Sequence, residues 1–365
     1  MKLLCTRNNI RDALQLAERF TGKNLTLPIL SNILLEADDK KVRCVATNLE
    51  IGVEISVSCK VIKEGSVTIP GKVINTLLQS IDDEAVTLEE KDNALTVKTD
   101  SSHFSIQGIP PKDFPLLPKI KKGREFSISS QELKNALGQV APAVAASDFR
   151  PELAGIFFKK DAKSLTLAAT DSFRLAEKTL ALKSYPGDSY SFILPSRTVQ
   201  ELMRTLPDTD GEVLIRESES QVFFEFDGIY IVSRLIDGNY PDYAAIIPKE
   251  FAAHVSLGRD ELIKKIKAAA VLASKLNDIS FYFSSSESFV EASNAEVGKS
   301  KIVFSSKIKG KEGRVSFNFR YLLDGLESLS GDEALISLNG DSGPALIRDP
   351  NNSSFQYVVM PIRNV

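Results

Sequence analysis

The sequence repeats a short segment at equal intervals, and this repeat constrains the fold more than any other feature. The tetrapeptides VATN, AATD and EASN contain Ala46, Ala169 and Ala292, which are 123 residues apart (169 − 46 and 292 − 169). In each copy the alanine is followed by Thr or Ser and then by Asn or Asp. Four matching residues are uninformative alone. Equal spacing along a chain of 365 residues indicates an internal repeat, which has to be recognised before single elements are assigned.

An amphipathic helix is predicted before each copy of this segment, because apolar residues recur there with helical spacing. The apolar positions are Ile10, Ala13, Leu14 and Ala17 before the first copy, Leu133, Ala136, Leu137 and Val140 before the second, and Leu262, Ile266 and Ala269 before the third. The letters SSQE at the start of the second of these helices form a capping signal. The three helices therefore belong to the same repeat as the tetrapeptides.

A second helix is predicted after each copy. The stretches VTIPGKVINTLLQSI, SFILPSRTVQELMRTL and VSFNFRYLLDGLESL each read as a short strand, a Pro or Asn, a basic residue and an amphipathic helix. Proline is well tolerated in the first turn of a helix, since the N–H it lacks would have no partner there. The basic residues are Lys72, Arg197 and Arg320. Helix, tetrapeptide and helix thus recur three times in the same order.

The rest of the chain reads as short strands joined by tight turns, for example at Asp92-Asn93 and Asp227-Gly228. Pro-rich, polar joins lie near residues 109–125 and 237–250. We therefore expect an α+β fold of three repeated domains, at residues 1–120, 125–245 and 247–365, each with two helices packed on antiparallel sheets.

Composition narrows the possible functions. The three cysteines, Cys5, Cys44 and Cys59, are an odd number at spacings that match no metal signature, so we expect a reducing compartment and no disulfide framework. The two histidines, His103 and His254, are too few for histidine-based catalysis or a histidine-rich metal site. No long apolar run or signal peptide is present, and the default expectation is a soluble cytoplasmic protein with no membrane partner.

Two local motifs are typical of catalysis but fit structural roles better. NGDSGPAL at residues 339–346 is similar to a serine protease motif, but it lacks the second Gly of that motif and has no histidine in a triad context. A hairpin turn is the simpler interpretation. The acidic residues at 82–84 and 89–90 lie in polar, turn-like segments and are interpreted as solvated surface. We therefore expect no catalytic residues, no metal and no cofactor.

Basic residues recur at equivalent helical positions. Arg197 and Arg204, like Lys72 and Gln79, are seven residues apart and so share one helix face. Further basic residues are Lys264, Lys265 and Lys267 on a predicted helix and Lys121, Lys122 and Arg124 in a join. Each could be an ordinary surface residue. If the repeated helices face one way, however, these residues form a positive surface on a chain whose net charge is −3, which is a requirement for binding nucleic acid.

At this point the whole chain resembles the family of bacterial sliding clamps, the beta subunits of DNA polymerase III. The most specific stretches are LTLPILSNILLE, ATDSFRLA, LIDGNYPDY and the terminal YVVMPIRNV. The resemblance implies a head-to-tail homodimer in which each chain is half of a six-domain ring, with helices lining a hole for duplex DNA. It also implies a non-catalytic processivity factor that binds DNA without regard to sequence and needs no cofactor.

The resemblance implies a partner pocket between the second and third domains. Its ligands would be short peptides with Gln, Leu and Phe from the polymerase, the clamp loader and repair proteins, which suits an adaptable groove of apolar and Met side chains. Carried over position by position, the pocket consists of Leu153, Thr170, Ser172, Phe173, Arg174, Leu175, Pro241, Ile246, Ser342, Pro344, Val358, Met360, Pro361 and Ile362. The family usually has Gly and then His or Tyr where this chain has Ser172 and Phe173.

The resemblance also implies a DNA-facing set and a dimer interface. The DNA-facing residues are Lys23, Lys72, Arg150, Arg197 and Arg204, with loop contacts near Asn24 and Ser147. The dimer interface joins Phe104 of one chain to Val271 and Leu272 of the other, although the latter two could instead be helix core. Val358 could likewise be strand core as well as pocket wall, whereas Met360 to Ile362 are harder to explain as core because Pro interrupts strand pairing.

Two other functions remain open from the residues alone. One is an enzyme on a repeated scaffold, which would require a metal, a cofactor or a catalytic triad. The other is an assembly protein with no DNA role, whose basic helix positions would not converge on one surface.

Overall fold

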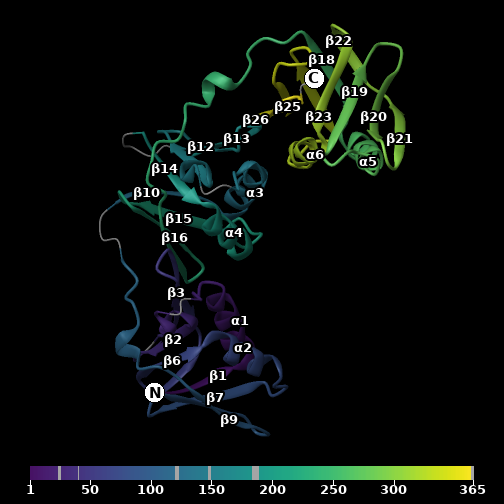
Figure 1. Cartoon of the computed structure of the whole chain (residues 1–365). Helices are drawn as coiled ribbons and strands as arrows, with labels where there is room; N and C mark the ends of the chain where they lie inside the picture. Colours follow the sequence, from purple (N-terminus) through teal and green to yellow (C-terminus); the bar gives the residue numbers. More distant parts are fainter. Residues whose placement is uncertain (24–25, 40, 120–122, 147–148, 183–188, 363–365) are drawn as a thin grey trace. The chain divides into compact units, whose positions relative to one another are not determined.

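The computed structural model describes residues 1–23, 26–39, 41–119, 123–146, 149–182 and 189–362 (Figure 1). Asn24 and Ser147, which the resemblance places near the DNA, lie outside these residues, as do Lys121 and Lys122. Contacts divide the chain into two compact units, which are described separately below. The first contains residues 1–131 and 200–235, and the second residues 132–199 and 236–365.

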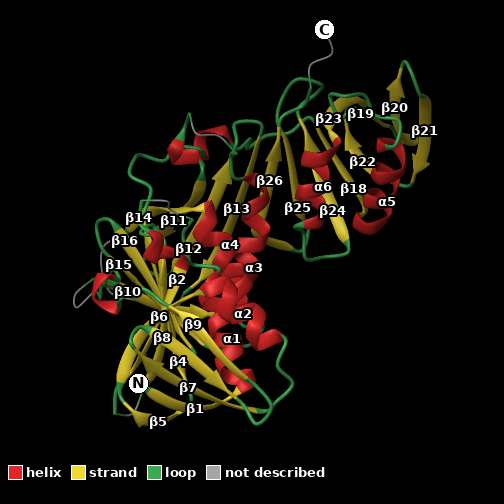
Figure 2. Ribbon diagram, turned by 60° about the horizontal axis from the view of Figure 1, so that its bottom comes forward, coloured by secondary structure: helices red, strands yellow, loops and turns green. Residues whose placement is uncertain are grey.

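The helices lie where the repeat predicts them. They are α1 (Arg7–Glu18), α2 (Gly71–Gln79), α3 (Ser130–Val140), α4 (Ser196–Thr205), α5 (Arg259–Ala270) and α6 (Phe319–Glu327). Every apolar position predicted for α1, α3 and α5 is buried, which confirms the helical spacing. Pro70 and Pro195 stand immediately before α2 and α4, one residue earlier than the first-turn position that the sequence suggested. Figure 2 shows α1 beside α2 and α5 beside α6, as their contacts require.

The first unit contains two antiparallel sheets. The five-stranded sheet has the order β5-β1-β7-β8-β9, and the eight-stranded sheet the order β10-β15-β16-β17-β4-β3-β2-β6. Their strands are β1 (Lys2–Thr6), β2 (Asn32–Ala37), β3 (Val42–Thr47), β4 (Ile51–Val57), β5 (Lys60–Lys63), β6 (Gly65–Pro70), β7 (Ala85–Lys91), β8 (Ala94–Lys98), β9 (His103–Gln107), β10 (Arg124–Ser129), β15 (Glu212–Glu217), β16 (Gln221–Phe226) and β17 (Ile229–Arg234). Because β17 pairs with β4, with Val232 opposite Gly52, strands of two repeats form one sheet.

The second unit repeats this arrangement. Its nine-stranded sheet has the order β14-β11-β12-β13-β26-β25-β24-β18-β22, and its four-stranded sheet the order β21-β20-β19-β23. The strands are β11 (Gly155–Lys160), β12 (Ser164–Thr170), β13 (Arg174–Ala181), β14 (Tyr190–Pro195), β18 (Ala253–Gly258), β19 (Asp278–Phe283), β20 (Ser288–Asn294), β21 (Gly298–Phe304), β22 (Lys307–Gly310), β23 (Gly313–Asn318), β24 (Glu333–Leu338), β25 (Ala345–Asp349) and β26 (Asn352–Val359). Here β13 pairs with β26, with Leu175 opposite Val358, and again strands of two repeats share a sheet.

The two-residue turns predicted between strands are present. Asp92 and Asn93 join β7 to β8 with φ of 54° and 62°, and Asp227 and Gly228 join β16 to β17 with φ of 45° and 74°. Positive φ at both central residues gives a hairpin turn whose twist matches that of the flanking strands, and Asn, Asp and Gly tolerate this conformation. The local sequence therefore fixes the register of these hairpins.

One prediction from composition is wrong. Cys5 and Cys59 form a disulfide, while Cys44 is free and buried, and burial raises the pKa of the Cys44 thiol to about 12. The reason lies in strand pairing. Leu3 is opposite Val61 and Leu4 opposite Lys60 in the antiparallel β1–β5 pair, and the next step of this register brings Cys5 to Cys59. Cysteine spacing along the chain could not show this.

We predict that the disulfide stabilises the first unit. It closes a loop between residues 54 apart, for which chain entropy gives about 2–4 kcal/mol. Cys59→Ser should lower the free energy of unfolding by that amount in a urea titration. Wild-type protein kept under dithiothreitol should match the variant, and the variant itself should not respond to the reductant. Equal stability of oxidised and reduced wild type would contradict the prediction.

Candidate functional site

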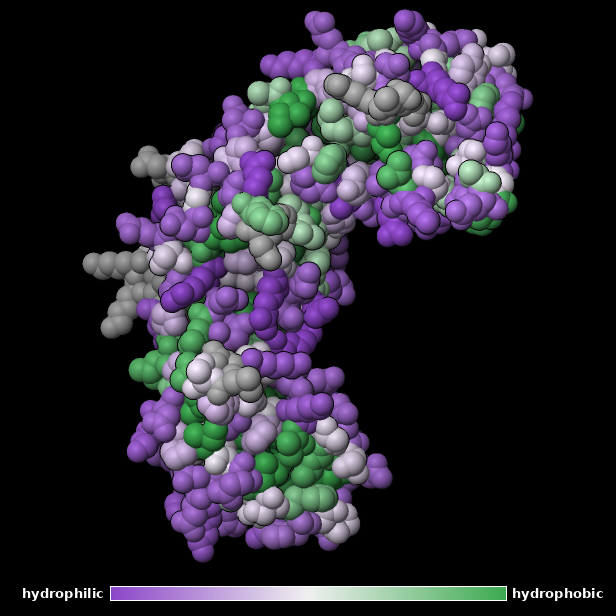
Figure 3. Space-filling model, viewed as in Figure 1, coloured by the Kyte–Doolittle hydropathy of each residue, from purple (hydrophilic) through white to green (hydrophobic). Residues whose placement is uncertain are grey.

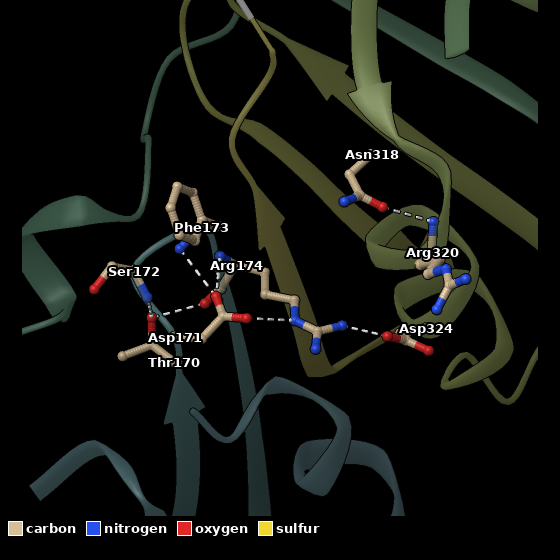
Figure 4. Close-up of polar contacts among 8 residues, drawn as sticks. All are labelled: Thr170, Asp171, Ser172, Phe173, Arg174, Asn318, Arg320 and Asp324. Atoms are coloured by element: carbon tan, nitrogen blue, oxygen red, sulfur yellow. Dashed lines mark hydrogen bonds and ion pairs between the residues drawn. The ribbon is translucent and has the colours of Figure 1, made fainter. Parts of the chain in front are cut away.

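The centre of the candidate site is the turn between β12 and β13, residues 170–174 (Figure 4). The Thr170 hydroxyl donates to the carbonyl of Arg174 (2.7 Å) and accepts from the N–H of Ser172 (3.2 Å). Asp171 Oδ1 accepts from the N–H groups of Phe173 and Arg174, both at 3.0 Å. The two side chains therefore satisfy the backbone groups that the turn leaves unpaired. Ser172 has φ of +76°, a conformation that glycine adopts most easily.

The same turn occurs between β3 and β4. The Thr47 hydroxyl donates to the carbonyl of Ile51 (3.0 Å) and accepts from the N–H of Leu49 (3.0 Å). Asn48 Oδ1 accepts from the next two N–H groups, and Leu49 has φ of +77°. In the third copy Asn294 Oδ1 accepts from the N–H of Glu296 (2.9 Å), while its amide donates to Ala273. The recurring tetrapeptide is thus the sequence of a side-chain-stabilised turn, which the third repeat has modified.

Residues 358–362 lie against the turn at residues 170–174. Leu175 pairs with Val358 in the β13–β26 ladder, and beyond it the Met360 N–H donates to the carbonyl of Phe173 (2.8 Å). The Ile362 N–H donates to the carbonyl of Ser316 on β23 (2.8 Å). Segments almost two hundred residues apart in sequence are therefore held together by main-chain hydrogen bonds. Since β26 lies between β13 and β25, it is an interior strand of the sheet.

Arg174 connects the turn to α6. Its Nε donates to Asp171 Oδ2 (2.9 Å), its Nη1 group pairs with Asp324, and its guanidinium lies over the Tyr321 ring at 4.3 Å from the ring centre. Only 12% of the side chain is exposed. Burial disfavours the charge of Arg174, but Tyr357, Asp171 and Asp324 outweigh this effect and raise its pKa above the ordinary value. Arg174 therefore remains cationic at any physiological pH.

The segment that precedes β18 packs on the sheet beside the turn. Tyr243 forms an apolar cluster with Ala168, Leu175, Leu346 and Val358, and Tyr240 stacks on Phe157 at 4.8 Å. Burial raises the pKa of both tyrosines, so both stay neutral. A cavity of about 380 Å³ opens beside this segment, and Pro241 is among its lining residues.

The structure brings part of the predicted pocket together. Main-chain contacts join the turn, residues 170–175, to residues 358–362. Ser342 and Pro344 lie in the loop before β25, whose first residue Ala345 pairs with Val359. Leu153 is buried at the end of a 3₁₀ turn (Pro151–Leu153), while Phe173 and Ile246 are 60% and 53% exposed. Leu175 and Val358 are sheet core, and their role as pocket wall stays a prediction.

The predicted DNA-facing residues are on the surface. Lys72, Arg197 and Arg320 are each the second residue of α2, α4 and α6, and all three are exposed. Arg204 pairs with Glu201 (3.3 Å) and Arg150 with Glu152 (3.0 Å), and both arginines, like Lys23, remain exposed. The basic positions of the repeat are therefore structurally equivalent.

The residues predicted for the dimer interface lie at sheet and helix ends. Phe104 is half-buried on β9, an edge strand of the five-stranded sheet. Val271 follows α5 and is 77% exposed, whereas Leu272 is half-buried. Val271 is thus not helix core, which was the alternative left open by the sequence.

Sequence reasoning missed Asp324 and Tyr321, which hold Arg174. A signal existed, because Asp324 stands 123 residues after Glu201 (324 − 201), which is the interval of the repeat. Both acids lie on the second helix of their repeat and both pair with an arginine. Acids on an amphipathic helix normally read as solvated surface, and this is why the pattern did not stand out.

Neither a metal site nor a membrane span was found within the described ranges. No group of three or more His, Cys, Asp or Glu residues there is placed to hold a metal ion. The helices of the same ranges all fall short of the length and apolar character that crossing a bilayer requires.

Comparison with known proteins gives consistent matches along the whole chain. Three family models of the DNA polymerase III beta subunit match it, the N-terminal domain over residues 1–118, the central domain over 127–242 and the C-terminal domain over 244–363. Proteins named beta sliding clamp from Synechococcus elongatus and Bacillus subtilis are 29% and 28% identical to it. These alignments cover 100% of this chain and 99% and 100% of the relatives.

Solved structures agree. The crystal structure of the DNA polymerase sliding clamp from Bacillus subtilis has a TM-score of 0.97 at 26% identity. That of a sliding clamp from Pseudomonas aeruginosa bound to griselimycin has a TM-score of 0.96 at 26% identity. Both comparisons cover 100% of each chain.

We predict that the threonine hydroxyls stabilise the two equivalent turns. Thr170→Val and Thr47→Val keep the side-chain shape but remove a donor and an acceptor at buried positions, which should cost about 1–3 kcal/mol each in urea unfolding. Thr170→Ser and Thr47→Ser retain the hydroxyl and serve as controls. Valine variants as stable as their serine counterparts would show that the hydroxyls contribute nothing.

Proposed function

Since the chain belongs to the family of bacterial DNA polymerase III beta subunits, the sliding clamps, we propose that it closes head to tail with a second copy into a ring around duplex DNA. A clamp is a processivity factor of the polymerase and not a catalytic subunit. In the proposed ring, helices face the DNA, and the turn at residues 170–174 with the end of the chain binds peptides of partner proteins. The proposed place of action is the cytoplasm.

The pairing of strands between repeats carries this proposal. The strand that follows the tetrapeptide pairs with the last strand of the next repeat in both cases within the chain, β4 with β17 and β13 with β26. The remaining members of this series are β21 and β9, and both are edge strands of their sheets. Pairing β21 of one chain with β9 of a second copy would satisfy both edges by the same rule. Two such junctions close a dimer in which neither β21 nor β9 remains an unpaired edge.

Helix ends follow the same rule. Arg19 at the end of α1 contacts Glu201 (3.3 Å) and Thr205 (2.7 Å) of α4. Gln139 near the end of α3 donates to the carbonyl of Ser328 just after α6 (2.6 Å). The repeat makes α5 and α2 the third pair, so the end of α5, with Val271, would face the end of α2 in the second copy.

Exposed apolar residues support this contact. Val271, Leu276, Val297 and Val303 are all exposed in the last repeat, around the end of α5 and along β21. On the first repeat, Val73 of α2 is exposed, and Figure 3 shows hydrophobic residues gathered where Figure 1 labels α2 and β1. Apolar surface of this kind on an otherwise hydrophilic chain is typical of an interface.

We expect Val271→Ala combined with Leu272→Ala to weaken the dimer. Truncating an apolar residue at the centre of an interface costs about 1 kcal/mol, and the dimer contains four such residues at its two junctions, so the dissociation constant should rise by roughly several hundred-fold. Light scattering over a dilution series measures the change. Leu116→Ala is the matched control, because Leu116 is 95% exposed and belongs to neither junction. A double variant that dissociates like wild type would refute this interface.

The basic helix positions support the DNA-facing role. Lys72, Arg197 and Arg320 begin equivalent helices, so a ring built by repetition would present them at equivalent places around its hole. Contacts of Lys and Arg with phosphates carry no sequence information, as required of a clamp that slides. The net charge of −3 leaves the rest of the surface without general attraction to DNA.

We expect Lys72→Glu, Arg197→Glu and Arg204→Glu together to weaken association with a short duplex and to reduce its dependence on salt. Six contacts in a dimer would flatten the logarithmic salt slope by up to about 5. The control is a triple variant in which three exposed strand lysines, Lys159, Lys307 and Lys309, are replaced by Glu. Equal effects of the two triple variants on fluorescence anisotropy would mean that net charge, not position, matters.

A further inference from the structure

We infer that the ion pair of Asp324 with Arg174, called the clasp below, positions the turn at residues 170–174. Asp324 thereby acts on peptide affinity without touching the peptide. This inference rests on the proposed function of the turn at residues 170–174. The residue that it adds is Asp324, which lies on α6 and outside the pocket predicted from the resemblance.

The guanidinium of Arg174 is fully engaged within the protein. Asp171 binds one edge and Asp324 binds another (Figure 4). Tyr321 covers one face, with its ring centre 4.3 Å from the guanidinium. Tyr321 also stacks on Phe173, with ring centres 6.5 Å apart. The turn and α6 are thus joined by one ion pair and two ring contacts. The fork of an arginine can bind two carboxylates in fixed directions, which the single ammonium of a lysine cannot.

Helix α6 is itself held firmly in place, so it can serve as the fixed side of the clasp. Leu322 and Leu326 are buried. A Cβ on Gly325 would lie only 2.5 Å from the Tyr357 ring of β26, so glycine is needed for this approach of helix and strand. Asn318 caps the helix by accepting from the N–H of Arg320 (3.0 Å). Movement of the turn relative to α6 therefore has to occur at its contacts with Asp324 and Tyr321.

The first unit contains a comparable pair that serves no turn. Glu201, the counterpart of Asp324, pairs with Arg19 from α1 (3.3 Å). The position equivalent to Arg174 is Ile51 (174 − 123), which cannot pair with an acid. Burial lowers the pKa of Arg19, partly offset by Glu201, whereas Arg174 is stabilised as a cation. An acid on the second helix is therefore paired with an arginine in both units, but only in the second unit does the arginine come from the peptide-site turn.

This difference supplies a matched control. Asp324→Asn and Glu201→Gln each remove one carboxylate charge on equivalent helices, although Glu201 pairs with Arg204 as well as with Arg19. Both should lower the melting temperature by similar amounts, since each leaves a half-buried arginine with one partner fewer. Only Asp324→Asn should release the turn that carries Ser172 and Phe173.

The experiment is a titration of each variant with a fluorescein-labelled pentapeptide that contains Gln and ends in Leu-Phe. We expect Asp324→Asn to weaken binding about tenfold, as for loss of one charged hydrogen bond, and Glu201→Gln to change it by less than about twofold. Arg174→Lys and the double variant with Asp324→Asn complete a cycle. The loss of binding free energy in the double variant should be smaller than the sum of the losses in the two single variants, because both substitutions disrupt the same ion pair.

Each outcome decides between the proposals. Unchanged affinity in Asp324→Asn overturns the clasp, as does equal weakening by Glu201→Gln, which would indicate general loosening. Additive effects in the cycle would show that Arg174 and Asp324 act separately and also overturn it. Failure of wild-type protein to bind the peptide, with the same result for a variant lacking residues 360–365, would overturn the proposed function together with the clasp.

Discussion

Pairing of β-strands across the boundaries between repeats is the constraint on which the rest of the structure depends. An edge strand presents unpaired N–H and C=O groups, and a protein has to pair or protect them. In this chain the strand after each of the first two tetrapeptides finds its partner in the next repeat, as β4 does in β17 and β13 in β26. The helices are placed by these sheets. Consequently the contacts of α1 with α4 and of α3 with α6 follow from strand pairing and are not independent of it.

The same pairing explains the composition of the candidate site. Because β26 pairs with β13, Met360 reaches Phe173 and Ile362 reaches Ser316. Arg174 stands where the paired strand meets α6, and so it can bind Asp171 and Asp324 at once. A buried cation between two carboxylates keeps its charge, and it holds its neighbours only as long as both acids are present. The turn at residues 170–174 is thus held in place both by main-chain hydrogen bonds to residues 358–362 and by the ion pairs of Arg174.

The sequence alone was sufficient for the repeat, the helices and the hairpin turns, because each depends on residues close together in the chain. The spacing of Ile10, Ala13 and Leu14 determines a buried helix face, and Asp92-Asn93 determines a turn. Contacts that depend on register between distant strands could not be read in this way. The Cys5–Cys59 disulfide follows from the β1–β5 register, and the Arg174–Asp324 pair joins residues 150 apart. The pocket residues came from resemblance, and the structure adds physical reasons for only some of them, such as the positive φ of Ser172.

The interior place of β26 has a consequence for biosynthesis. This strand is made after every other strand that the structure describes, yet it lies between β13 and β25. While the chain is still on the ribosome, β13 has no partner on that side, and the turn at residues 170–174 cannot meet residues 358–362. The basic positions of α2 and α4, in contrast, are formed early. A prematurely terminated chain would therefore carry the basic helix positions without the β13–β26 ladder, and the proposed peptide site would require translation through residues 358–362.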